Sequence, residues 1–126
     1  MTVIMLLNSL FFVDPINSTG HSVEATVRIE KSHPIFEGHF PGQPILPGVC
    51  MMQLVKELLE SADQKKYQLE SAGNMKFLNV IDPTVNAQVN ASILIEQRNE
   101  QGLKINASLF AGDVTFFKLK ASLKSA

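Results

Sequence analysis

The stretch from Ser32 to Glu60 reads SHPIFEGHFPGQPILPGVCMMQLVKELLE, a loop rich in proline and glycine that runs directly into a helical pattern. His39 lies in this loop, and histidine is the side chain best suited to moving protons near neutral pH. The residues around it restrict the backbone or allow dihedrals that other residues avoid. They are Gly38, Pro41, Gly42, Pro44, Pro47 and Gly48. The stretch therefore predicts an active-site loop followed by a helix.

Apolar residues at helical spacing predict that one stripe of this helix faces a core. The stripe comprises Met51, Leu54, Val55, Leu58, Leu59 and Ala62. Lys56, Glu57 and Glu60 are expected to point away from the core. Residues 49–52 are apolar on every side of the helix, so we expect its first turns to be buried all round.

Alternating apolar and polar residues predict strands on both sides of the helix. Residues 23–29 form one strand with a single buried face. A shorter strand is expected around residues 73–80, and longer strands are expected at 85–93, 103–109 and 114–123. A strand, a long buried helix and an antiparallel meander give an α+β layout. A sheet wrapped around one central helix satisfies this order.

Length and charge narrow the class of protein. A chain of 126 residues supports one core, so residues 1–126 are expected to form a single domain. The net charge of -1 offers no basic surface for nucleic acid or a membrane. The single cysteine, Cys50, fits a reducing compartment and a cytoplasmic protein. No group of residues has metal-ligand spacing, and the apolar start of the chain is expected to be part of the fold.

Residues 38–49 match the pattern Gly-His-Phe-Pro-Gly-x-Pro-x-x-Pro-Gly-Val at every fixed position. The pattern resembles the signature of the hotdog-fold 3-hydroxyacyl-(acyl-carrier-protein) dehydratases. The resemblance implies removal of water from a 3-hydroxyacyl thioester to give a trans-2-enoyl thioester, without a cofactor. It implies that His39 is the catalytic base and that the backbone N–H groups of Gly48 and Val49 stabilise the thioester oxygen. Phe40, Pro47, Cys50 and Met52 are expected to line the acyl tunnel, and Cys50 is also expected to pack in the core.

One departure from the family pattern concerns the catalytic acid. The family carries a catalytic glutamate fourteen residues after the histidine, where this chain has Gln53. Glu57 lies one turn further, about 5.4 Å along the helix, where the family tends to have glutamine. An amide gives up no proton, so three alternatives stay open. Glu57 acts through a shifted substrate or a bridging water, a paralogous partner subunit lends its glutamate to His39, or the reaction is a different one.

These alternatives lead to three functional hypotheses. The first is a dehydratase-like enzyme acting on thioesters of acyl carrier protein in fatty acid or polyene synthesis. The second is an acyl thioesterase, and the third is a non-catalytic acyl-binding or partner subunit. The resemblance implies at least a homodimer, with a higher oligomer or a heteromer open. The cations expected to dock an acidic carrier protein are Arg28, Lys31, Lys65 and Lys66.

A second departure lies at the N-terminal end. The family usually has a His-Arg-Tyr-Pro element before its first strand, and residues 6–9 of this chain read Leu-Leu-Asn-Ser instead. Residues 10–14 resemble the family's first strand, so we expect a strand to begin there.

Overall fold

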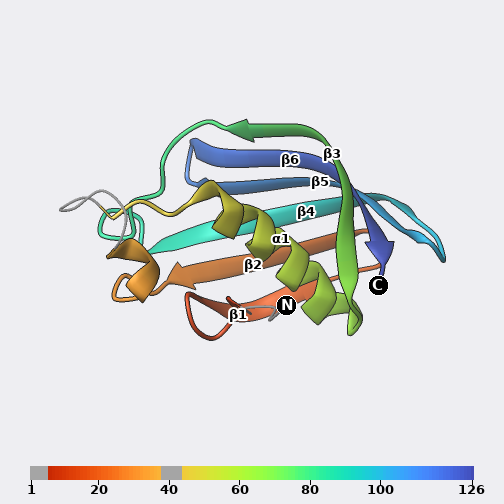
Figure 1. The fold of residues 1–126 in the computed structure, drawn as a ribbon, viewed down its shortest axis with the longest axis horizontal. Helices are drawn as coiled ribbons and strands as arrows, with labels where there is room; N and C mark the ends of the chain where they lie inside the picture. The colour runs from red at the N-terminus through yellow and green to blue at the C-terminus, as the bar shows by residue number, and fades with distance from the viewer. Residues whose placement is uncertain (1–5, 38–43) are drawn as a thin grey trace.

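The computed structural model describes residues 6–37 and 44–126, in which a six-stranded antiparallel sheet packs against one long helix (Figure 1). The strand order across the sheet is β1-β2-β4-β5-β6-β3. The elements are β1 (Phe11–Ser18), β2 (Ser22–Ile29), the 3-10 turn η1 (Pro34–Phe36), α1 (Gly48–Asp63), β3 (Tyr67–Phe77), β4 (Gln88–Arg98), β5 (Gly102–Ala111) and β6 (Val114–Ser125). The predicted α+β layout is confirmed.

The core lies between α1 and the face of the sheet that the helix crosses (Figure 1). Side chains of β5 and β6 alternate between this face and solvent, as the period of two in their sequences predicts. The inward residues are Leu103, Ile105, Ala107 and Leu109 on β5 and Phe117, Leu119, Ala121 and Leu123 on β6. Leu54, Leu58 and Leu59 of α1 are fully buried in the same core cluster. Each such leucine contributes roughly 1.5 to 3 kcal/mol to folding.

Two strands differ from their predicted bounds. β3 begins at Tyr67, not near residue 73, because pairing with β6 alone orders it while most of its residues stay exposed. Its sequence therefore lacks the alternation that signals a half-buried strand. β4 begins at Gln88, since the Asp82 carboxylate accepts hydrogen bonds from the backbone and hydroxyl of Thr84 and closes a turn. Val85 lies in this turn and is 76% exposed.

The helix begins at Gly48, but two predictions about its faces were wrong. Glu57 and Glu60 do not point away from the core, because both are buried, with exposed fractions of 0% and 6%. Both carboxylates accept hydrogen bonds from backbone N–H groups outside the helix, which makes their burial tolerable. The first turns are not buried all round either, since Val49 is 70% exposed.

The described start of the chain joins the core, as expected. Leu6 and Leu10 are buried, and the backbone of residues 6–10 turns back on itself through hydrogen bonds to the Leu6 carbonyl. β1 then begins at Phe11, within the range predicted for the first strand. None of the helices in residues 6–37 and 44–126 has the length and apolar character needed to cross a membrane.

Candidate active site

The N-terminal end of α1 presents backbone hydrogen-bond donors. The helix follows Pro47, whose carbonyl accepts the Cys50 N–H at 3.0 Å, and no side chain caps it. The backbone N–H groups of Gly48 and Val49 donate to no residue within the described ranges. Such groups carry partial positive charge and suit a developing oxyanion. The role predicted for the N–H groups of Gly48 and Val49 stays a prediction.

The glycine at position 48 leaves room for a ring at the end of β3. A Cβ atom on Gly48 would be 2.6 Å from Cε1 of Phe77. The Phe77 ring is held in turn by Phe117 on β6, with ring centroids 5.0 Å apart. A larger residue would require the half-exposed Phe77 ring to shift.

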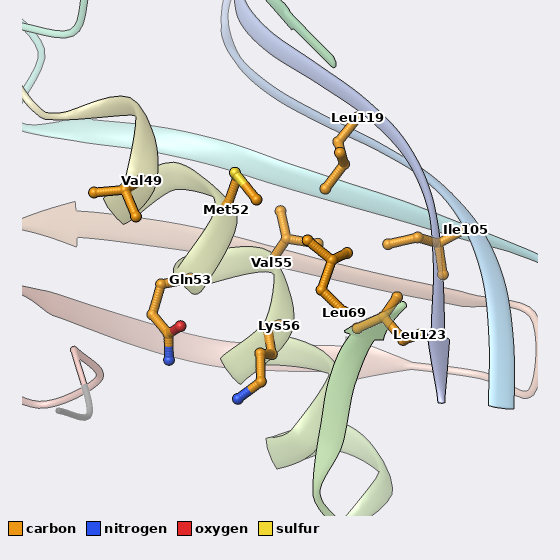
Figure 2. Close-up of a pocket in the computed structure, with 9 residues that line it drawn as sticks. All are labelled: Val49, Met52, Gln53, Val55, Lys56, Leu69, Ile105, Leu119 and Leu123. Atoms are coloured by element: carbon orange, nitrogen blue, oxygen red, sulfur yellow. The ribbon is translucent and has the colours of Figure 1, made fainter. Parts of the chain in front are cut away.

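An apolar groove of about 110 Å³ runs between α1 and strands β3, β5 and β6 (Figure 2). It begins at Val49, in the first turn of the helix, and its two polar side chains come from the helix. The lining residues are Val49, Met52, Gln53, Val55, Lys56, Leu69, Ile105, Leu119 and Leu123. A carbonyl bound at the helix start would direct an attached alkyl chain into this groove. The geometry therefore suits an acyl thioester.

Gln53 is bonded to Glu57, not free at the groove. Its Nε2 donates to Glu57 Oε2 at 2.9 Å. The same carboxylate accepts the Leu6 N–H at 2.9 and 3.0 Å and the Leu7 N–H at 2.9 Å. All of these donors are N–H groups, which suit the ionised carboxylate because it only accepts hydrogen bonds. Glu57 thus connects the chain before β1 to the helix and to Gln53.

The expectation that Glu57 is a solvated surface residue was wrong, since its side chain is fully buried. Its direct role as an acid remains a prediction, but the carboxylate is absent from the groove lining and both of its oxygens are occupied. The geometry favours an anchoring role for Glu57. Gln53 is the member of the pair that reaches the groove.

Glu60, one turn nearer the end of α1, is a second buried carboxylate with structural contacts. It accepts the Tyr67 N–H at 2.9 Å and pairs with the Lys56 ammonium at 3.2 Å. These contacts join the end of the helix to the start of β3. They also hold Lys56 at the side of the groove.

A cluster of hydrogen-bonded side chains lies at the C-terminal end of α1. The Tyr67 hydroxyl donates to Asp63 at 2.6 Å, and Arg98 on β4 donates to the same carboxylate oxygen at 3.0 Å. Burial, followed by the hydrogen bond to Asp63, raises the pKa of Tyr67 to about 12. The phenol is therefore protonated at neutral pH, and the group ties α1 to two strands.

The remaining predicted site residues occupy different places. His39 and Phe40 lie outside the described residues. Met52 lines the groove, whereas Pro47 lines a separate hollow of about 450 Å³ beside the ends of α1 and β3. Cys50 packs in the core, and burial raises the pKa of its thiol. The tunnel as a whole stays a prediction.

Sequence reasoning missed six groove residues, of which Val55 was assigned only to the stripe of the helix that faces the core. Lys56 could have been found, because it lies seven residues after Val49 on the same helical stripe. The other four come from strands that meet the helix only in the folded chain, and no local pattern marks them. They are Leu69, Ile105, Leu119 and Leu123.

The fold is that of a hotdog protein, and comparisons with known proteins assign the chain to a dehydratase family. The family model "ApeI-like: ApeI dehydratase" matches residues 15–112, and the chain belongs to this family. The predicted family resemblance and the hotdog fold are confirmed.

Curated relatives share the dehydratase name. The 3-hydroxyacyl-(acyl-carrier-protein) dehydratase FabZ of Rickettsia bellii is 28% identical over 103 residues, which cover 75% of this chain and 68% of the relative. The protein of the same name from Ruminiclostridium cellulolyticum is 26% identical over 129 residues, with 93% and 88% covered. Among solved structures, the dehydratase heterocomplex ApeI:P from Xenorhabdus doucetiae matches with a TM-score of 0.72 and 21% identity, over 90% of this chain and 97% of that one. That structure supports the fold.

Proposed function

We propose that the protein acts on 3-hydroxyacyl groups carried as thioesters on acyl carrier protein, and that it removes water to give the trans-2-enoyl thioester. The observation that carries this proposal is the apolar groove beside the N–H groups of Gly48 and Val49, which donate to none of the residues that the structure describes. Membership of the ApeI-like dehydratase family and similarity to FabZ proteins support the substrate class.

The reaction assigns a task to each part of the site. His39 removes the C2 proton, and the helix N–H groups stabilise the negative charge that gathers on the thioester oxygen. The double bond forms between C2 and C3 as the C3–O bond breaks, and the departing oxygen takes up a proton to leave as water. The Gln53 amide has no proton to give, so an acid must come from elsewhere. The three alternatives for Gln53 stay open. The Glu57 carboxylate is buried and both of its oxygens accept hydrogen bonds, which favours a carboxylic acid lent by a paralogous partner subunit.

A second candidate is a non-catalytic partner subunit that keeps the groove and lacks the acid. The observation that favours it is Gln53 at the place of the family's catalytic glutamate. The similarity to a structure titled as a dehydratase heterocomplex supports an assembly of unlike subunits for both candidates.

We also propose that the protein forms at least a dimer through β3. This edge strand is eleven residues long, is exposed after Tyr67 and presents Leu69, Met75 and Phe77 to solvent. The opposite edge, β1, contains Pro15 and a register shift between Val13 and Ile16, features that hinder strand addition. Light scattering at micromolar concentration tests this, and a monomer would contradict it.

The decisive experiment supplies the purified protein with 3-hydroxyacyl, trans-2-enoyl and saturated acyl thioesters of acyl carrier protein. Interconversion of the first two, abolished by His39→Ala, is the expected result. Release of free thiol would identify a thioesterase instead. Binding without turnover would identify the partner subunit.

A further inference from the structure

Exposed lysines gather on the face of strands β3, β5 and β6 that points away from α1. On β5 and β6 they alternate with buried residues of the core, so their side chains lie on the opposite face of the sheet. Lys76 of β3 pairs directly with Lys118 of β6 and therefore shares its face. The helix covers only the other side of the sheet (Figure 1). We call this surface the lysine face, and it comprises Lys76, Lys104, Lys118, Lys120 and Lys124.

The residues around the lysine face do not neutralise its charge. Lys76 and Lys118 face each other, and every other cross-strand partner of the five lysines is glutamine, asparagine, serine or glycine. None of the five ammonium groups forms an ion pair with a residue in the described ranges. This holds even for Glu70, which lines a hollow together with Lys104 and Lys124.

Protection of a sheet edge does not account for the lysine face. Lysine on an edge strand hinders unwanted strand addition, which explains Lys76 on β3. Strand β6 lies between β5 and β3, so its three lysines have no edge to protect. Like charges directly opposite each other also destabilise a sheet, and Lys76 and Lys118 are such a pair. An anionic partner would remove that repulsion.

The chemistry of the lysine face favours a diffuse anionic surface over a partner of fixed shape. Protein interfaces are enriched in aromatic residues, methionine and arginine and depleted in lysine, and single-stranded nucleic acids need aromatic rings on which their bases stack. The positions beside the lysines on β5 and β6 provide none of these, since they are Asn106, Ser108 and Ser122. Lysine is a hydrated point charge that attracts anions without a fixed geometry. Along β6 the lysines span about 20 Å, from Lys118 to Lys124.

We propose that the lysine face docks the protein on a membrane surface that contains anionic lipids. The groove residues Leu119 and Leu123 lie on the other face of β6, so a bilayer against the lysines leaves the groove open to substrate. A net charge of -1 does not indicate such a surface, because the fold gathers five of the 11 basic residues on one face. Dimerisation through β3, as proposed above, would place a second lysine face beside the first on one continuous sheet.

Binding to lipid vesicles tests the proposal without any thioester. Co-sedimentation should show that the natural protein binds vesicles of phosphatidylglycerol and phosphatidylcholine, and does not bind vesicles of phosphatidylcholine alone. Each lysine near an anionic bilayer strengthens binding by about 5-fold. The triple variant Lys118→Gln, Lys120→Gln and Lys124→Gln should therefore bind about 100-fold more weakly. Salt at about 1 M, where the Debye length is about 3 Å, should release the natural protein.

A matched control separates the lysine face from net charge. Lys31→Gln, Lys65→Gln and Lys66→Gln together remove the same charge from exposed positions outside the lysine face, and this variant should bind within about 5-fold of the natural protein. All six substitutions are at exposed positions, so both variants should keep the fold, which circular dichroism checks.

Three outcomes would overturn the proposal: no binding to the anionic vesicles, equal binding to both kinds of vesicle, or an equal loss in the two triple variants. Tighter binding to an acidic peptide or to DNA than to the vesicles, lost in the lysine-face variant, would assign the lysine face to that partner and reject the membrane. Failure of the thioester turnover assay leaves the vesicle result unaffected. The proposed reaction and the docking surface are therefore tested separately.

Discussion

Replacing Gln53 with glutamate should create the acid that the chain lacks, and the structure specifies how. The new carboxyl group would lie about as far from Glu57 Oε2 as the amide nitrogen does now, which is 2.9 Å. Two ionised carboxylates at that separation would repel by roughly 6 kcal/mol with an effective dielectric constant near 20, so the pair retains one proton. That shared proton lies between Glu57 Oε2 and the new carboxyl group, and the side chain at position 53 is the one of the two that lines the groove.

Gln53→Glu should therefore raise hydration of trans-2-enoyl thioesters by about 100- to 10,000-fold, the usual contribution of a general acid. The assay is the loss of enoyl thioester absorbance as a function of pH. Since only the protonated form acts, activity should fall as the pH passes the raised pKa of the introduced carboxyl group. The double variant Gln53→Glu with Glu57→Gln lacks the neighbouring charge, so its activity should fall at a lower pH.

An unchanged rate in folded Gln53→Glu would refute this reasoning. So would activity that persists after His39→Ala is added. If Glu57 is the working acid instead, Glu57→Gln will remove activity from the natural protein and Gln53→Glu will add little.

Three further predictions concern stability and docking. Glu57→Ala should lower the free energy of unfolding by roughly 3 to 5 kcal/mol in urea titrations, because it leaves buried N–H groups unpaired, whereas Glu24→Ala on an exposed strand position should change it little. Tyr67 is the only tyrosine of a chain without tryptophan, so tyrosinate absorbance reports its titration directly, which should centre near pH 12. Folding raises this pKa from 10.0, so the contribution of Tyr67 to the free energy of unfolding is complete below about pH 10 and is lost as the pH rises through about 12. The loss should be roughly 2 to 3 kcal/mol. A Tyr67→Phe variant that loses the same stability over that pH range would contradict this. Reversing the charges of Lys65 and Lys66 should weaken turnover of carrier-bound substrates and spare small thioester analogues, and an equal loss on both would refute carrier docking there.

Local patterns predicted the elements that alternate or recur cleanly. β2, β5 and β6 each bury every second side chain, and the apolar stripe of α1 has the spacing of a helix, so sequence periodicity was enough. The motif at residues 38–49 indicated the family, and the comparisons confirm it. Gln53 was recognisable as a departure for the same reason, since its place is counted from His39.

Strand β3 and the glutamates of α1 were not readable in this way. β3 pairs on one side only and stays exposed, so it has no alternation to detect. Glu57 looks like a surface residue because its partners are 51 and 50 positions away, at Leu6 and Leu7. A buried charge is tolerated when distant donors satisfy it, and the helical spacing contains no information about those donors.

The sequence by itself determined the class of fold, the family and the residue at the acid position, because these depend on periodicity and on a contiguous motif. Only the tertiary structure decided that Glu57 is an internal anchor, that the nitrogen of Gln53 is bound to it, and that strands β3, β5 and β6 complete the groove. Each of these depends on atoms brought together from distant parts of the chain. Hydrogen bonding and burial act on such neighbours in space, and adjacency in sequence does not specify them.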